Sequence, residues 1–243
     1  MADGDRSCSH EPDTMSQTTH SVAILAGGRA TRFDGRDKGM LLIDGRTIRD
    51  RQVAALSSLT DDILIVGVDV ARRLPASARP MTQRASARLA EAPEARRRQP
   101  SETTAPRWVA DIVPGCGPLG GLHAALTEAR GDAVFLVACD MPYITAPFVA
   151  YLLSLAYDAD IVMPQTERGY HPLCAVYTRA CLAPVAARLA DRRLRMRELV
   201  EEMPTRVVTA EEIDRFGDRH LLLANVNTPA EYAGLDTLQG HKL

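Results

Sequence analysis

The sequence predicts a single α/β domain, in which a mostly parallel sheet is covered by helices on both faces. Short runs of β-branched and other apolar residues, each of strand length, alternate along the chain with amphipathic stretches of helix length. Parallel strands need such crossover helices, and helices on both faces make a three-layer domain. With 243 residues, of which 46% are hydrophobic and 25% charged, the chain can bury one sizeable core.

Most strand candidates are uninterrupted apolar runs, which are typical of strands buried on both faces. They cover Ser21–Ala26, Asp62–Gly67, Trp108–Val113, Ala133–Ala138, Asp160–Met163, Leu173–Tyr177 and Leu221–Asn225. The helix candidates are Thr47–Ser58, Leu119–Ala129, Ala146–Ala156, Arg179–Ala190, Arg195–Glu202 and Pro229–Ala233. In the second of these helices, Leu119, Leu122 and Leu126 recur at i, i+3 and i+7 and form one core-facing stripe.

Three segments fall outside the expected core of the domain, which spans residues 21–235. Residues 1–20 form a polar N-terminal tail, and residues 236–243 form a C-terminal tail. Residues 71–107 contain nine Arg, five Pro and three Glu but almost no large apolar side chains, so burial cannot offset the entropy of ordering them. We expect a flexible, solvated insertion there. The alternative is a basic arm that meets an acidic partner or an anionic substrate.

Composition excludes several classes of protein. No apolar run approaches the roughly 20 residues that span a bilayer, and the first 20 residues are polar, so neither a membrane anchor nor a secretory signal is expected. The five cysteines form no C-x-x-C pair and indicate reduced thiols. A formal charge of −2 gives no global field for nucleic acid or anionic lipid. The sequence thus predicts a cytoplasmic protein with no nucleic-acid or membrane partner.

The loop after the first strand candidate carries the clearest chemical signal. Gly27, Gly28 and Gly35 let backbone N–H groups approach anionic oxygens, and Arg32 and Lys38 add positive charge. Lys38 stands out because the chain has only one other lysine. The spacing does not match a Walker loop. We therefore expect a phosphate site, the alternative being an ordinary glycine-rich surface turn.

A second glycine-rich segment, residues 115–120, reads G-x-G-x-x-G between a strand and a helix candidate. This spacing is typical of dinucleotide binding, with Asp140 as the acid twenty residues further on. The match is weak, because Pro118 makes the turn rigid and the acid is not followed by a second crossover of the usual kind. Asp111, at the end of the preceding strand, either contacts a ligand or caps a turn.

One carboxylate follows the most apolar strand candidate. Ala133–Ala138 leads to Asp140 at its carboxyl end, which is where open α/β sheets bind their ligands. A short, hard carboxylate suits Mg²⁺, which takes one or two protein carboxylates plus substrate phosphate oxygens. Asp140 is therefore the candidate metal ligand, the alternative being a cap for the turn before Pro142.

These motifs together resemble those of one enzyme family. The run L-A-G-G-x-x-x-R-x-x-G-x-D-K at residues 25–38 is similar to the signature of nucleotidyltransferases that load a nucleoside monophosphate onto a phosphorylated acceptor. C-D-M-P at residues 139–142 and N-V-N-T-P at residues 225–229 resemble two further family motifs. In this order and spacing, they most resemble the molybdenum cofactor guanylyltransferases. The resemblance implies a Rossmann-like nucleotidyltransferase fold.

The resemblance also implies a set of site residues. Lys38 and Asp140 would be the catalytic residues, with Asp140 binding Mg²⁺ and Lys38 on the phosphates of GTP. The molybdopterin acceptor would lie against His171, Arg193, Asn225 and Asn227, although His171 also suits a strand edge, Arg193 a solvated surface and Asn227 a helix cap. The nucleotide would contact Leu25, Ala26, Gly27, Gly28, Arg32, Gly35, Lys38, Asp111, Gly117, Gly121 and Asp140.

The implied reaction transfers GMP from GTP to the terminal phosphate of the molybdenum–molybdopterin cofactor and releases pyrophosphate. The attacking phosphate oxygen is already anionic near pH 7, so no general base is needed. A molybdoenzyme or its insertion chaperone would be the protein partner. Two alternatives stay open. One is another nucleotidyltransferase, with cytidylyl transfer to molybdopterin or transfer to a sugar or lipid phosphate. The other is a non-catalytic nucleotide-binding module in cofactor insertion.

Overall fold

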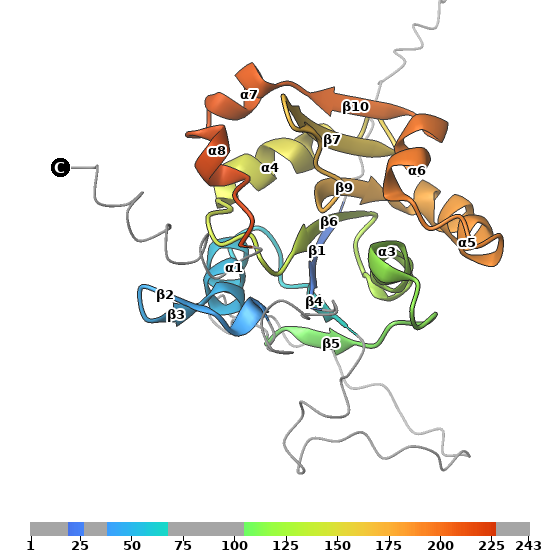
Figure 1. Ribbon diagram of the computed structural model, residues 1–243, viewed down its shortest axis with the longest axis horizontal. Helices are drawn as coiled ribbons and strands as arrows, with labels where there is room; N and C mark the ends of the chain where they lie inside the picture. The colour runs from blue at the N-terminus through green and yellow to red at the C-terminus, as the bar shows by residue number, and fades with distance from the viewer. Residues whose placement is uncertain (1–18, 27–37, 68–104, 227–243) are drawn as a thin grey trace, which may run out of the picture.

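The computed structural model describes residues 19–26, 38–67 and 105–226, which form an eight-stranded sheet with helices on both faces and a separate two-stranded hairpin (Figure 1). The strands of the main sheet are β1 (His20–Leu25), β4 (Ile63–Val66), β5 (Arg107–Val109), β6 (Ala133–Ala138), β7 (Ile161–Thr166), β8 (Gly169–Tyr170), β9 (Cys174–Thr178) and β10 (Thr205–Val208). The hairpin pairs β2 (Leu42–Ile43) with β3 (Arg46–Thr47). The helices are η2 (Lys38–Met40), α1 (Ile48–Leu56), α3 (Gly117–Glu128), α4 (Ala146–Ser154), η4 (Arg179–Cys181), α5 (Leu182–Ala190), α6 (Met196–Glu202), α7 (Ala210–Asp214) and α8 (Arg219–Leu222).

The order of strands in the main sheet is β10-β7-β9-β6-β1-β4-β5, with β8 paired to β7. β1 lies parallel to both of its neighbours, β4 and β6. At the two edges of the sheet, β5 pairs in parallel with β4, and β10 pairs in parallel with β7. β9 runs antiparallel to β6 and to β7. The predicted mostly parallel sheet is therefore confirmed, with β9 and the short β8 as its reversed strands.

Alternate side chains of the central strands enter two hydrophobic cores. On β6, Val134 and Leu136 face a core shared with α3, α5 and α6, while Phe135 and Val137 face a core shared with α1, α4, α7 and α8. All four side chains are fully buried. An uninterrupted apolar run is what a strand covered on both faces requires, and the three-layer prediction holds.

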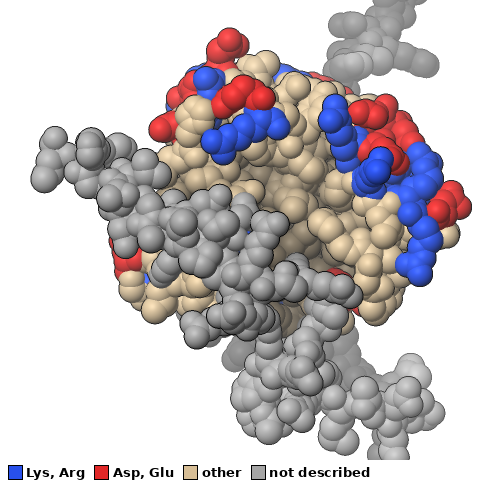
Figure 2. All heavy atoms as spheres, in the orientation of Figure 1, with Lys and Arg blue, Asp and Glu red and all other residues tan. Residues whose placement is uncertain are grey.

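The chain crosses from one side of β1 to the other, which places a crevice at the carboxyl end of β1. After β1 it forms β4 and β5 on one side, and then β6 on the opposite side. In open α/β sheets, ligands bind outside the carboxyl ends of the strands at such a switch point. Figure 2 shows this face of the molecule hollowed near its middle, with charged side chains gathered at the rim over α6 and over α7 and α8.

One predicted strand, Leu221–Asn225, is wrong. Residues 219–222 form α8, because Asp218 accepts a hydrogen bond from His220 N at 2.8 Å and so starts a helical turn. The apolar run still contributes to the hydrophobic core, because Leu222 and Leu223 are buried beside α7. The prediction for Trp108–Val113 is too long, and β5 instead includes Arg107, which the sequence had assigned to the insertion.

Several predictions fall outside the described residues. They are the C-terminal tail, most of the 71–107 insertion, the helix Pro229–Ala233 and all but the last two residues of the N-terminal tail, of which His20 begins β1. Within the three described stretches, every helix is too short or too polar to cross a membrane.

Candidate active site

The turn after β6 holds Asp140 at the carboxyl edge of the sheet. Cys139 N donates a hydrogen bond to the carbonyl of Leu25, the last residue of β1, at 3.1 Å. Val226 N donates to the carbonyl of Asp140 at 2.9 Å. Asp140 therefore lies between the end of β1 and the C-terminal end of the described chain, as expected for a ligand-binding residue at the switch point.

Lys38 and Asp140, predicted as the catalytic residues, are in direct contact. Lys38 Nζ lies 3.1 Å from Asp140 Oδ2, and their side chains are 22% and 15% exposed. Asp140 Oδ1 is buried and has no hydrogen-bond partner among the described residues. An anionic oxygen in that state is costly unless a further donor or cation meets it. The donor set therefore fits a hard divalent cation.

The surroundings of Asp140 also suit a cation that takes most of its ligands from elsewhere. Nowhere in the described part of the chain do three or more His, Cys, Asp or Glu side chains gather as a metal cluster. Mg²⁺ keeps several waters and is typically held by one or two carboxylates together with substrate phosphates. A single aspartate at the carboxyl edge of the sheet fits that pattern.

A small hydrophobic cluster supports the segment that carries Lys38. Ile43 of the hairpin and Ile48 of α1 pack against Val226, and Leu41 and Tyr143 lie beside them. The cluster joins the region after η2 to the residue whose N–H binds the carbonyl of Asp140. Lys38 and Asp140 are thus anchored to one packing unit although 102 positions separate them in sequence.

Gly117 and Gly121 occupy the first turns of α3, and the structure explains why each position has a glycine. Gly117 has a positive φ of 59°, which favours glycine. A Cβ on Gly121 would lie 2.7 Å from Leu25 Cδ2, so glycine here allows α3 to pack closely on β1. The predicted contacts of Leu25, Ala26, Gly117 and Gly121 with a nucleotide stay predictions.

Asp111 lies in the loop between β5 and α3, at the carboxyl side of the sheet. Its side chain is half-buried, and burial raises the pKa of the carboxyl above its ordinary value. Among the described residues, the structure shows no ion pair between Asp111 and a cation, and its contact with a nucleotide stays a prediction.

His171 is a predicted acceptor residue, and its contact with an acceptor stays a prediction. It follows β8 and its Nε2 lies 2.9 Å from Thr166 Oγ1. Burial, with a smaller contribution from the charge of Arg168, lowers the pKa of His171 and favours the neutral ring. A small polar cavity between the β7–β8 hairpin and α8 is lined by Thr166, Glu167, Arg168, His171, Arg219, His220 and Leu223.

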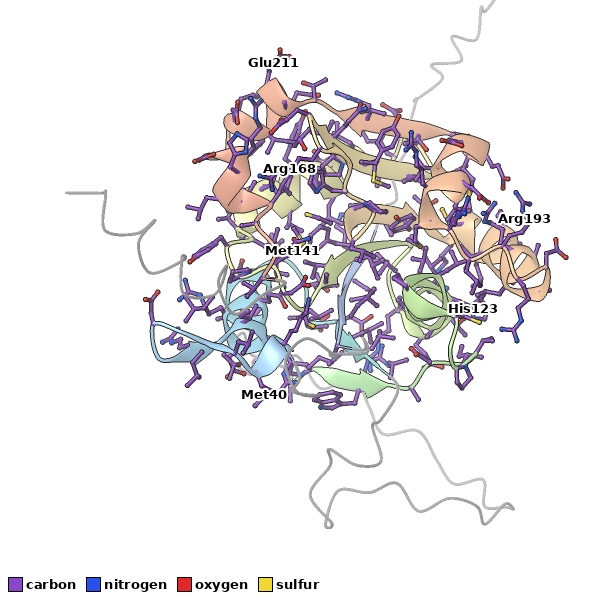
Figure 3. The ribbon with its side chains drawn as sticks, in the orientation of Figure 1. Met40, His123, Met141, Arg168, Arg193 and Glu211 are labelled. Carbon is purple, nitrogen blue, oxygen red and sulfur yellow. The ribbon has the colours of Figure 1, made fainter. Side chains whose placement is uncertain are left out.

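Of the other predicted acceptor residues, Asn225 lies near Asp140 and Arg193 does not. Asn225 is exposed and adjoins Val226, so the structure brings it close to Asp140. Arg193 is instead paired with Glu202 in an ion-pair network that also includes Glu198. Figure 3 shows Arg193 at the edge of the molecule beside α6, well away from Met141 in the middle. The structure thus does not bring Arg193 to the turn that holds Asp140.

Five predicted site residues lie outside the described residues: Gly27, Gly28, Arg32, Gly35 and Asn227.

Sequence reasoning missed Gln52, a polar residue in contact with the Asp140 turn. Ile48, Gln52 and Leu56 are the buried residues of α1 and recur every four positions, so the glutamine stands in the core-facing stripe. Its Nε2 donates to the carbonyls of Ala138 and Met141 at 2.8 and 3.0 Å. A polar residue inside an otherwise apolar stripe was the signal that could have identified it.

The chain resembles known proteins over most of its length. It is 27% identical over 209 residues to a molybdenum cofactor guanylyltransferase of Desulfosudis oleivorans, covering 86% of this chain and 90% of that one. It is 30% identical over 198 residues to a probable molybdenum cofactor guanylyltransferase of Methanothermobacter thermautotrophicus, covering 80% and 89%. The fold matches that of the Archaeoglobus fulgidus molybdopterin-guanine dinucleotide biosynthesis protein A with a TM-score of 0.69 and 18% identity, over 90% of this chain and 98% of that one.

The family relationship follows from a match along the domain itself. Residues 22–207, which run from β1 through most of β10, match the pattern that defines the MobA-like NTP transferase domain. The match includes both Lys38 and Asp140 and extends over well more than half of the chain. This protein therefore belongs to the MobA-like NTP transferase family.

Proposed function

We propose that this enzyme is a molybdenum cofactor guanylyltransferase, which transfers GMP from GTP to the terminal phosphate of molybdenum–molybdopterin and releases pyrophosphate. The observation that carries the proposal is the Lys38–Asp140 pair at the carboxyl ends of β1 and β6. One cation and one incompletely satisfied carboxylate at a switch point are the elements needed to neutralise a triphosphate. The names of the relatives support guanine as the base and molybdopterin as the acceptor.

Asp140 would hold Mg²⁺ through its carboxylate, and the metal would supply positive charge that neutralises the phosphates. Lys38 has a separate task, since its ammonium group can leave the carboxylate and donate to phosphate oxygens. The backbone of Leu25 and Ala26, at the end of β1, would position the nucleotide. No protein base is needed, because the acceptor phosphate is already anionic near pH 7.

In the transfer step, an oxygen of the acceptor phosphate bonds to the α-phosphorus of GTP, and the bond from that phosphorus to the bridging oxygen breaks. Pyrophosphate leaves with the negative charge. Lys38 stabilises this charge as it develops, so the chain contributes positioning and electrostatics rather than a covalent intermediate.

The acceptor is expected on the side of the crevice formed by the end of the chain and the β7–β8 hairpin. Asn225 supports this assignment because it adjoins the residue that binds the Asp140 carbonyl. His171 supports it because burial keeps the ring neutral and able to accept or donate a hydrogen bond to a pterin edge. Delivery of the product to a molybdoenzyme or its insertion chaperone belongs to the same proposal.

The test is pyrophosphate release from GTP or CTP with Mg²⁺, each with and without molybdenum–molybdopterin. We expect release only with GTP and acceptor together. Release with CTP would reassign the base. A further mixture contains GTP with a sugar or lipid phosphate, and release in that mixture alone would reassign the acceptor. GTP binding without release in any mixture would contradict an enzymatic role.

A further inference from the structure

The turn that holds Asp140 is closed by a side chain from another layer of the fold. Its backbone closure is weak, since Met141 N lies 3.4 Å from the carbonyl oxygen of Ala138. Gln52 of α1 donates from Nε2 to the carbonyls of both Ala138 and Met141, at 2.8 and 3.0 Å. One amide group thus joins the first and last residues of the four-residue turn.

The orientation of the Gln52 amide is fixed by chemistry. Both of its partners are carbonyl oxygens, which only accept hydrogen bonds, so the NH₂ group must face the turn and use both of its donors there. The side chain is 1% exposed and therefore has no room to exchange these bonds for bulk water. The turn and the helix are joined by a contact with a single geometry.

Gln52 makes this contact at a cost. Its Oε1 is buried and has no hydrogen-bond partner among the described residues. A buried amide oxygen without a donor is unfavourable, and an apolar side chain between Ile48 and Leu56 would avoid the penalty. Packing alone therefore does not account for a glutamine at this position, whereas the two donor bonds to the Asp140 turn do.

We infer that Gln52 is a positioning residue for the metal site, holding the turn so that the Asp140 carboxylate faces the crevice in the geometry that binds a divalent cation. Residues that orient a metal ligand commonly change metal affinity or activity 10- to 100-fold when they are replaced. The inference rests on the proposed function, in which Asp140 binds the metal. It assigns Gln52 no contact with nucleotide or acceptor.

The test measures binding of Mn²⁺ in the presence of GTP and without acceptor, followed through water-proton relaxation. Q52M keeps an unbranched side chain of similar length but has no donor. We expect its Mn²⁺ affinity to fall by about 10-fold or more. In the full reaction, the metal concentration for half-maximal rate should rise by a similar factor, and excess metal should recover most of kcat.

A matched control separates positioning from general stability. Thr60 Oγ1 donates to the carbonyl of His20 at 2.7 Å, which is a side-chain bond to backbone at the opposite end of β1. T60V removes that bond, and we expect it to lower the urea midpoint while leaving Mn²⁺ affinity unchanged. If Q52M does not fold, Q52A replaces it, since alanine favours the helix and leaves space for a water between the two carbonyls.

The outcomes distinguish this inference from the proposed function. A wild-type Mn²⁺ affinity in folded Q52M or Q52A, with D140N having lost Mn²⁺ binding, would overturn the role of Gln52 alone. A wild-type Mn²⁺ affinity in D140N would overturn the metal assignment itself. An affinity loss in T60V equal to that in Q52M would show that the effect is one of stability.

Discussion

Lys38 Nζ lies 3.1 Å from Asp140 Oδ2, so the ammonium group covers one oxygen of the proposed metal ligand when no nucleotide is present. Both side chains are partly exposed, and ion pairs of that kind contribute only about 0–1 kcal/mol to stability. The pair is therefore poorly explained as a device for holding the fold. The pair is better explained if Lys38 binds a polyanion and Asp140 binds a metal.

Replacing Asp140 by Asn should remove activity and spare the fold. Asn keeps the shape of the side chain but loses the charge that a divalent cation needs, so we expect pyrophosphate release to fall by at least about 100-fold. The unfolding free energy should change by only about 1 kcal/mol. Asp132, the residue before β6 at its other end, provides the control, because D132N removes an exposed carboxylate next to the same strand. Near wild-type release in D140N would contradict the assignment.

Replacing Lys38 by Met should change metal and nucleotide binding in opposite directions. The competing ammonium is gone, so Mn²⁺ alone should bind several-fold more tightly. GTP should bind about 10-fold or more weakly, because a hydrogen bond from a charged group is worth roughly 1.5–3 kcal/mol. Titration of K38M with Mn²⁺, and separately with GTP, tests both signs. As the control, K38R keeps the charge and should bind Mn²⁺ as weakly as the wild type. Weaker Mn²⁺ binding in K38M than in the wild type would contradict the prediction, because it would mean that Lys38 helps the Asp140 carboxylate to bind the metal.

Gly121 tests the close packing of α3 on β1. Its added Cβ would lie 2.7 Å from Leu25 Cδ2, so G121A must push the leucine side chain aside or shift the helix. Overpacking of this size costs about 1–3 kcal/mol. L25V removes both Cδ atoms, and the double variant G121A/L25V should recover part of the loss in a urea-unfolding cycle. If the losses of unfolding free energy in G121A and L25V simply add in the double variant, the strain does not come from this contact.

The sequence alone was sufficient to predict the layers of the fold, because a strand that is buried on both faces is an uninterrupted apolar run. The run at residues 133–138 is wholly apolar, and all of it is buried in β6. The same signal failed at residues 221–225, where an apolar run of strand length begins in the last turn of α8, a short helix capped by Asp218, and continues as irregular chain. Local sequence signals also mark the start of α7, at the capping box of Thr209 and Glu212, and the Asp44–Gly45 turn of the hairpin.

The site was less accessible to pattern reasoning because it is assembled across the sheet. Spacing could place Asp140 at the end of a strand, but no periodicity relates it to Lys38, which is 102 residues away. The resemblance to a family assigned both residues to one active site, and the structure supplies the contact between them. Gln52 is marked only as a polar residue in the apolar stripe of α1, and its role follows from neither route, since its partners are backbone carbonyls that carry no sequence signature.

Asp62 should matter for stability and not for catalysis. It lies at the amino end of the sheet, where its carboxylate accepts hydrogen bonds from Ser21 Oγ, Arg130 N and the guanidinium of Arg107. Burial alone would raise the pKa of Asp62, but these bonds outweigh it and lower the pKa. D62N leaves the buried network incomplete, which costs about 3 kcal/mol or more. Urea unfolding measures the loss, and the turnover of the folded fraction should match the wild type; a specific loss of turnover would place Asp62 in the site.

Glu212 should make stability depend on pH in the acid range. Burial alone would raise its pKa, but hydrogen bonds from Tyr151, Thr209 N and Arg206 outweigh it and lower the pKa from 4.5 to about 2. A carboxylate with a lowered pKa stabilises the fold fully above its unfolded pKa of 4.5, and the contribution disappears as the pH falls toward 2. The shift corresponds to about 3 kcal/mol at most.

E212Q should therefore be less stable than the wild type at pH 7, with a difference that is constant down to about pH 5 and shrinks below it. Urea unfolding at pH 7, 5 and 3.5 measures this difference. The matched control is E211Q, since Glu211 is the exposed neighbour on the same helix and points away from the fold (Figure 3). A difference between E212Q and wild type that stays constant down to pH 3.5 would mean that the hydrogen bonds of Glu212 do not favour its charged form.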